Sequence, residues 1–271
     1  MDKVVMAGVF DFVNFHVCKA LLDKGIEVRG VQIETGDDRD ILDEKRFEIG
    51  RNANFNEVSL EEISNNSFDN ESIVLSAYDL FMRYKEDYLL NEEKLFNLIS
   101  QNTWEQIVIL VHSQMLANEF GSKAEIVIDD FINRAKGNKK DIQLLYLPTI
   151  FGTWQPDTFM FQNSILTEMN RGKPFRGLRE ETSDAIFVDD AVQSIIEIIE
   201  NKQPGRYLLQ SGKNDQWNLC ASFLRINEQA SIERKAETME DNITIFTVKS
   251  TVSIAKGLTE QIDHAHRLNS K

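Results

Sequence analysis

The spacing of apolar residues in the first stretch of the chain predicts a β-α-β unit. An apolar run, Val4–Ala7, reaches Gly8, and apolar residues then recur at helical spacing until Gly25. The stretch Glu27–Ile33 has the composition of a second strand. Parallel strands joined by a crossover helix belong to a sheet that is covered by helices. We therefore expect the chain to begin as part of a parallel α/β sheet.

In the rest of the chain, segments with strand patterns alternate with segments with helix patterns. This order predicts a doubly wound α/β fold with a mainly parallel sheet and a small C-terminal lobe. The expected strands are Glu57–Leu60, Ser72–Ala77, Gln106–Val111, Ile142–Leu147 and Arg206–Gln210, and the expected helices are Asn91–Gln101, Ala117–Ala135, Phe159–Asn170, Phe187–Glu200 and a final one near Val252–Leu268. His112 and Ser113 follow the most apolar strand, at the end where open parallel sheets place ligands.

Composition and charge narrow the classes of partner. The 271-residue chain has a formal net charge of −14 with acidic residues spread along it, which indicates a solvated surface and opposes binding to nucleic acid. No apolar run approaches the roughly 18 residues of a membrane span, and no signal-peptide pattern precedes the first strand. Cys18 and Cys220 have no metal-ligand spacing. We expect a cytoplasmic protein that binds neither nucleic acid, membrane nor metal.

Six segments resemble, in sequence order, the motifs of one protein family. They are AGVFDFVNFHVCKALLDKGIEVRGV (residues 7–31), SKAEIVIDDF (122–131), LLYLPTIFGTWQP (144–156), AIFVDDAVQSIIEIIE (185–200), GRYLLQSGK (205–213) and VSIAKGLTEQIDHAH (252–266). The family is the extended short-chain dehydrogenase/reductases, or NAD-dependent epimerase/dehydratases, which act largely on nucleotide sugars. The resemblance implies a Rossmann-like domain of the dinucleotide-binding type over residues 1–150, with residues 151–271 completing the sheet and forming a small substrate-type lobe. It also implies NAD or NADP as cofactor and a nucleotide sugar as ligand.

The cofactor motif departs from the family pattern after its first glycine. Gly8 matches the first glycine of the motif T-G-x-x-G-F-I-G, whereas Asp11 and Asn14 stand where the second and third are expected. Those glycines let the backbone approach a pyrophosphate and let the helix pack close to the strand. Asp11 places a carboxylate where the pyrophosphate would bind, and each repelling charge pair at about 4 Å costs on the order of 4 kcal/mol. We expect Asp11 to cap the free N–H groups of the helix in place of a phosphate.

The acid that would hold the adenosine ribose is also missing, because Gln32 occupies its position at the end of the second strand. Glu34 lies two residues later, on the same side of an ideal strand, and is either a substitute ligand of the ribose or a surface acid. No arginine directly follows the strand, so nothing favours a 2′-phosphate. The sequence thus lacks the ordinary site for NAD or NADP.

The catalytic signature keeps a lysine and a serine but not the tyrosine. In the family, a tyrosine four residues before a lysine exchanges a proton with the substrate hydroxyl while the nicotinamide takes a hydride, and the lysine lowers the phenol pKa. Lys123 matches the lysine and Ser113 the serine, whereas Glu119 occupies the tyrosine position. Glu119 and Lys123 are either an ordinary i, i+4 ion pair on a helix surface or the remainder of a polar pocket.

Two further regions contact ligands in the family. Trp154 and Gln155 lie in the loop that lines the substrate cleft there. Arg176 and Arg179 lie where the family contacts nucleotide-sugar phosphates, although no motif maps onto them and solvated charge is the simpler interpretation.

The sequence leaves three hypotheses for function. In the first, the chain has lost standard hydride transfer and keeps a binding or regulatory role. In the second, it is an active NAD(P)-dependent epimerase, dehydratase or reductase that uses Glu119, Ser113 or another side chain for proton transfer, with Lys123 assisting. In the third, it is a scaffold in which the helices at Asn91–Gln101 and Ala117–Ala135 form a homodimer, as they do in the family.

Overall fold

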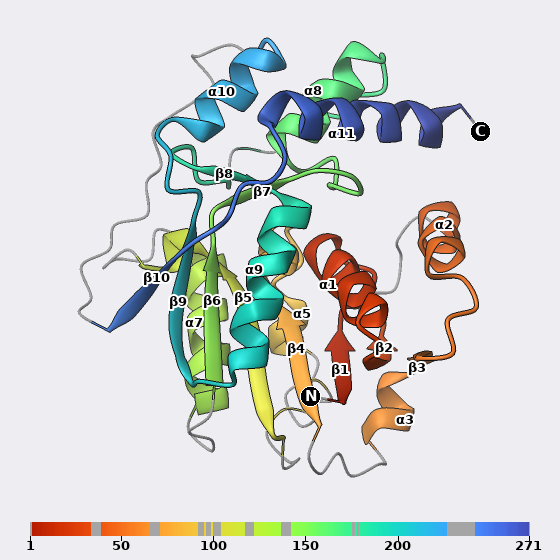
Figure 1. Cartoon of the computed structure of the whole chain (residues 1–271), viewed down its shortest axis with the longest axis vertical. Helices are drawn as coiled ribbons and strands as arrows, with labels where there is room; N and C mark the ends of the chain where they lie inside the picture. Colours follow the sequence, from red (N-terminus) through yellow and green to blue (C-terminus); the bar gives the residue numbers. More distant parts are fainter. Residues whose placement is uncertain are drawn as a thin grey trace.

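Eight parallel strands form the central sheet of the computed structural model (Figure 1). In spatial order they are β10 (Ile243–Thr247), β9 (Gly205–Gln210), β6 (Ile142–Leu147), β5 (Gln106–His112), β4 (Ser72–Ser76), β1 (Lys3–Ala7), β2 (Glu27–Val31) and β3 (Phe55–Val58). The structure describes residues 2–33, 39–64, 71–91, 95, 99, 104–116, 122–136, 142–174, 177, 179–226 and 242–270. The predicted doubly wound α/β fold is confirmed.

The direction in which strands are added reverses beside β1. After β1 the chain adds β2 and β3 on one side, and it then returns to place β4 on the other side of β1. The central strands β4, β5 and β6 are buried at every position, because both faces of the sheet are covered. In sheets of this kind, ligands bind outside the carboxyl ends of the strands at the point of reversal. For this chain that point lies at the ends of β1 and β4.

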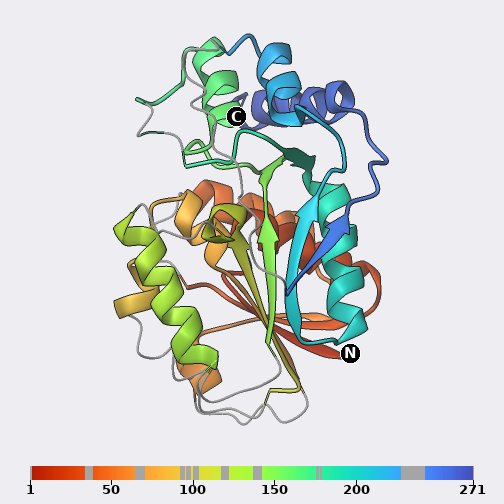
Figure 2. The ribbon, with the colours of Figure 1, turned by 90° about the vertical axis from the view of Figure 1, so that its left-hand side faces the viewer.

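Helices lie on both sides of this sheet. Figure 2 shows α7 (Lys123–Lys136) on one side and α9 (Val188–Asn201) on the other. α1 (Phe12–Asp23) packs beside α9. The shorter helices are α2 (Arg39–Ile49), α3 (Leu60–Ser64), α4 (Ala77–Met82) and α5 (Tyr88–Asn91).

A smaller group of elements lies beyond the carboxyl ends of the strands (Figures 1 and 2). It contains the parallel pair β7 (Thr149–Phe151) and β8 (Ala185–Phe187), together with α8 (Met160–Glu168), α10 (Gln216–Phe223) and α11 (Ile254–Asn269). α11 packs against both α8 and α10. Among the helices that the structure describes, none is both long enough and apolar enough to cross a membrane.

Some boundaries differ from the sequence predictions. Phe187 was expected to open a helix, but it ends β8 because it pairs with Phe151 of β7, so α9 begins one residue later. β10 was not predicted, since an edge strand with exposed and half-buried positions has no clear apolar pattern. The described part of the helix expected over Ala117–Ala135 begins at Lys123, and residues 117–121 lie outside the described residues, as do most of residues 92–103.

Candidate functional site

The turn between β1 and α1 is built around Gly8. Its φ of +79° lies in the left-handed region, and its N–H donates to the carbonyl oxygen of Val31 at 2.8 Å. A Cβ atom at this position would collide with Oδ2 of Asp11, so the glycine also makes room for that carboxylate. Every residue from Gly8 to Asn14 is buried. The carboxylate of Asp11 therefore lies inside the turn and not on its surface.

Asp11 forms a partly buried ion pair in this turn. It is the N-cap residue of α1, but its side chain makes no cap hydrogen bond, so the expectation that it caps the helix was wrong. Its Oδ1 accepts instead from Nη1 of Arg83 at 2.6 Å, and the two side chains are 7% and 14% exposed. Arg83 follows α4, so the pair joins the β1–α1 turn to the segment after β4.

The first turn of α1 is capped by a residue far away in the sequence. Asp79, in α4, accepts from the N–H of Val13 at 3.0 Å through Oδ2 and from the N–H of Asn14 at 3.3 Å. Asp79 is fully buried, and this burial raises the pKa of its carboxyl, while the hydrogen bonds from Ser76, Val13 and Asn14 and the charge of Arg83 act in the opposite direction. A carboxylate of this chain thus occupies the helix end at which Rossmann folds bind pyrophosphate.

Asn14, at the position of the third glycine, takes part in the contact between α1 and β1. Its Nδ2 donates to the carbonyl oxygen of Ala7, the last residue of β1, at 2.8 Å. The side chain is fully buried, and its Oδ1 has no hydrogen-bond partner among the described residues. A polar side chain therefore fills the space that a glycine would leave between helix and strand.

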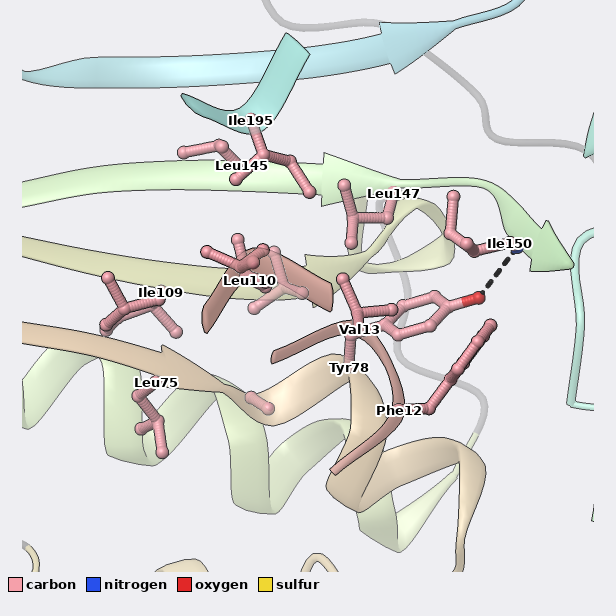
Figure 3. Packing of buried hydrophobic residues seen from close by; sticks show 14 of the residues in the cluster. Phe12, Val13, Leu75, Tyr78, Ile109, Leu110, Leu145, Leu147, Ile150 and Ile195 are labelled. Carbon is pink, nitrogen blue, oxygen red and sulfur yellow. Dashed lines mark hydrogen bonds between the residues drawn. The ribbon is translucent and has the colours of Figure 1, made fainter. Parts of the chain in front are cut away.

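Aromatic side chains pack beside the ends of β1 and β4. The ring of Phe159 contacts Phe12 at a centroid distance of 5.7 Å and Tyr78 at 6.2 Å. Tyr78 accepts a hydrogen bond from the N–H of Ile150 at 3.0 Å (Figure 3), and its burial raises the pKa of the phenol. The three aromatic side chains are at most 1% exposed. The carboxyl ends of β1 and β4 are consequently packed by the protein itself.

Lys45 of α2 binds to the backbone of the β1–α1 turn. Its Nζ donates to the carbonyl oxygen of Phe10 at 2.5 Å and lies 5.4 Å from the ring centroids of both Phe15 and Trp154. The lysine is only 6% exposed. A buried cation held over two aromatic rings is favourable because the ring faces carry negative charge.

Ser113 and Lys123 are not brought together as a catalytic pair. Ser113 is buried in the 3₁₀ turn after β5 and donates through Oγ to the carboxylate of Glu181. Lys123 is exposed as the first residue of α7, and within the described part of the chain no hydrogen bond or ion pair joins it to Ser113 or to a tyrosine. Glu119 lies outside the described residues.

The proposed ribose contacts are only partly described. Gln32 is half-buried after the end of β2, whereas Glu34 lies outside the described residues.

The segment 179–183 forms hydrogen bonds with Phe81 of α4, Ser113 after β5 and Thr149 of β7. Arg179 pairs with Glu86 at 2.9 Å and donates to the carbonyl oxygen of Phe81, so it is not the solvated charge expected from the sequence. Glu180 accepts from the N–H of Met160, at the start of α8, at 2.7 Å, and burial raises the pKa of its carboxyl to about 8. The side chain is 2% exposed, and its Oε1 has no hydrogen-bond partner among the described residues.

His112, the last residue of β5, is held by stacking. Its ring lies 3.8 Å from the ring of Phe81 and nearly parallel to it. Neither ring nitrogen has a hydrogen-bond partner among the residues that the structure describes. Burial and the charge of Arg179 lower the pKa of the imidazole to about 3, so the side chain is neutral at pH 7.

Trp154 and Gln155 pack within the protein. Nε1 of Trp154 donates to Glu48 at 2.8 Å, and its ring lies 4.4 Å from His264 of α11. Gln155 donates to the carbonyl oxygen of Ile150 and accepts from Gln261 at 2.7 Å. Both residues are less than a tenth exposed, so they tie the loop after β7 to the final helix.

Sequence reasoning missed the residues that fill the site. Asp79 lies 66 residues from Val13, and Arg83 lies 72 residues from Asp11. The one available signal was the Ser-x-x-Asp spacing of Ser76 and Asp79 directly after a buried strand, which is typical of a helix start.

No family model matches the chain, and no curated protein matches it in sequence. Solved structures do match it in fold. The UDP-glucuronic acid 4-epimerase of Bacillus cereus, in complex with UDP-glucuronic acid and NAD, superposes with a TM-score of 0.68 at 15% identity, over 98% of this chain and 99% of that one. The UDP-glucose 4-epimerase of Thermotoga maritima, with UDP-glucose, gives 0.62 at 12% identity over 98% and 99% of the two chains. TunA, an NAD-dependent NDP-hexosamine 5,6-dehydratase, gives 0.62 at 11% identity over 98% of each.

These structural neighbours are NAD-dependent epimerases and dehydratases of sugar nucleotides. At such low identity the likeness shows that this chain shares their fold.

Proposed function

We propose that this chain is a non-catalytic protein on the fold of the NAD-dependent sugar-nucleotide epimerases and dehydratases, and that it has a binding or regulatory role without standard hydride transfer. The observation that carries the proposal is the Asp79 carboxylate on the N–H groups of Val13 and Asn14. A dinucleotide in the ordinary pose would need those donors for its pyrophosphate.

The carboxylates at this turn add an electrostatic obstacle to the occupied N–H groups. Asp11 and Asp79 both lie at the β1–α1 turn, and Arg83 acts on each of them. An uncompensated pyrophosphate–carboxylate pair at about 4 Å would cost on the order of 4 kcal/mol, or roughly a thousandfold in affinity, and the Arg83 guanidinium offsets part of this repulsion. NAD and NADP therefore do not fit the residues present at this turn.

The described candidates for proton transfer, Ser113 and Lys123, support the same conclusion. Ser113 is engaged by Glu181 under the segment 179–183, and Lys123 is exposed at the start of α7. The phenol of Tyr78 is fully buried and receives the N–H of Ile150. We assign no catalytic step to these groups.

Calorimetric titration of the purified chain with NAD and with NADP tests the proposal, with the Bacillus cereus epimerase as the positive control. We expect no saturable binding up to about 1 mM cofactor, which is the weak limit of an ordinary cofactor site. Micromolar binding, together with conversion of UDP-glucuronic acid or UDP-glucose to an epimerised, dehydrated or oxidised product, would support the active-enzyme hypothesis and refute ours.

We also propose that the chain forms a homodimer through α7. Ile126 is 56% exposed on this helix, whose other apolar residues are buried. Light scattering at micromolar concentration measures the oligomeric state, and Ile126→Glu should convert a dimer to a monomer because it places a charge in the apolar contact.

A further inference from the structure

A cavity of about 630 Å³ lies outside the carboxyl ends of β6 and β9. Figure 1 shows the β7–β8 pair and α10 beyond these strand ends. The size is typical of a site for a small molecule, since such pockets measure roughly 300–1,000 Å³. Its lining comes from four places in the chain: Pro148, residues 181–184, residues 208–210, and the loop and first turn of α10, namely Gly212, Lys213, Asn214, Asp215 and Asn218.

The cavity is separate from the filled turn before α1. Its lining includes no residue between Gly8 and Asn14, and neither Asp79 nor Lys123 contributes to it. A ligand could therefore occupy the cavity while the β1–α1 turn stays closed.

Two carboxylates of the lining are held in fixed positions. Glu181, which is 6% exposed, accepts from the hydroxyls of Ser113 and Ser183, one on each oxygen. Asp184 accepts from the N–H of Ser211 at 2.8 Å and from the N–H of Ala185 at 2.9 Å. Side chains held in this way can bind a ligand without losing further rotamer freedom.

The remaining polar groups define which ligand charge is favourable. Asp215 is an exposed third carboxylate, and among the described residues of the lining the one cation is Lys213. Amide side chains come from Gln210, Asn214 and Asn218. Acceptors thus outnumber cationic donors, and negative charge exceeds positive charge.

We propose that this cavity binds a small polyol that carries an amino group and neither phosphate nor carboxylate, chemically an amino sugar. Its hydroxyls would donate to the carboxylates and amide oxygens, and its ammonium would be attracted by the excess negative charge. A phosphate or carboxylate on the ligand would meet Glu181, Asp184 and Asp215, and the described residues of the lining offer Lys213 alone to offset them. This inference rests on the proposed binding role, because it names the class of ligand that the protein would bind.

Calorimetric titration of the full chain with glucosamine, and with glucuronate as an anionic sugar of similar size, tests the inference. We expect saturable glucosamine binding, at least about tenfold tighter than that of glucuronate, because one charge pair near a protein surface contributes about that factor or more. Asp215→Asn should weaken glucosamine binding about five- to tenfold. Glu197→Gln, an exposed acid on α9 outside the cavity lining, is the matched control and should leave the affinity unchanged.

Any one of the following results would overturn the inference. They are no saturable glucosamine binding up to about 50 mM, which is weaker than any specific site, tighter binding of glucuronate or UDP-glucuronic acid than of glucosamine, and equal loss of affinity in Asp215→Asn and Glu197→Gln. Ethanolamine binding as well as glucosamine would also refute it, since the polyol would then contribute nothing. The titration with NAD tests the occupied β1–α1 turn, and the titration with glucosamine tests the cavity. Failure of one proposal can therefore be distinguished from failure of the other.

Discussion

Replacing Glu180 with glutamine should change how the stability of the protein depends on pH. Burial raises the pKa of this carboxyl from its ordinary value of 4.5 to about 8 in the folded protein. Between these values the folded chain keeps a proton that the unfolded chain has lost. The contribution of Glu180 to stability is therefore fully present below pH 4.5 and falls as the pH rises toward 8.

The difference between the folded and the unfolded pKa of Glu180 sets the size of this change in stability. It corresponds to a loss of roughly 5 kcal/mol across the window, and the side chain is too deeply buried for solvent to screen the charge. Glutamine stays neutral and keeps an oxygen that can accept from the N–H of Met160. Its buried NH₂ group costs about 1–3 kcal/mol if it lacks a partner, but this cost is the same at every pH. The pH dependence of the difference between variant and wild type is thus the informative quantity.

Urea denaturation, followed by tryptophan fluorescence from pH 5 to pH 9, measures this difference. We expect Glu180→Gln to gain several kcal/mol relative to wild type between the two ends of the range, following the linkage above. Glu197→Gln removes an exposed carboxylate on α9 and should run parallel to wild type. A difference between Glu180→Gln and wild type that stays constant from pH 5 to pH 9 would refute the assignment of a buried, protonated acid.

The other predictions concern the filled turn and the stacked histidine. Asp79→Ala should cost about 2–4 kcal/mol in urea denaturation because two buried N–H groups of α1 lose their acceptor, whereas Asp87→Ala, at an exposed position, should change stability by less than about 0.5 kcal/mol. Gly8→Ala should cost more than the roughly 1–2 kcal/mol expected for Gly50→Ala, because both glycines have left-handed φ but only Gly8 faces a colliding carboxylate; equal losses would contradict this packing. His112→Phe should reduce acid unfolding, since the folded imidazole has a pKa lowered to about 3 and its contribution to stability is present above pH 6.5 and lost as the pH falls toward 3. The measurement is the free energy of unfolding between pH 4 and pH 7, and an unchanged slope would count against it.

The pattern of apolar residues predicted every strand of the central sheet except the edge strand β10. Ile142–Leu147 was predicted as a strand and is β6, and the run beginning at Gln106 is β5 with one residue more than expected. Such runs are informative because strands that are buried on both faces must be apolar at nearly every position. The same local reasoning predicted α1 and the turn at Gly8.

Local patterns could also show that Asp11 and Asn14 replace glycines, but not what their side chains contact. The cap on α1 comes from Asp79, and the partner of Asp11 is Arg83, each more than 60 residues away. Which of two neighbouring carboxylates accepts the N–H groups of a helix depends on the positions of both in space, and this is set by how α4 packs after β4. Residue spacing therefore predicted most of the sheet and its main helices, while the packing of distant segments decided that the turn is occupied by side chains of the protein itself.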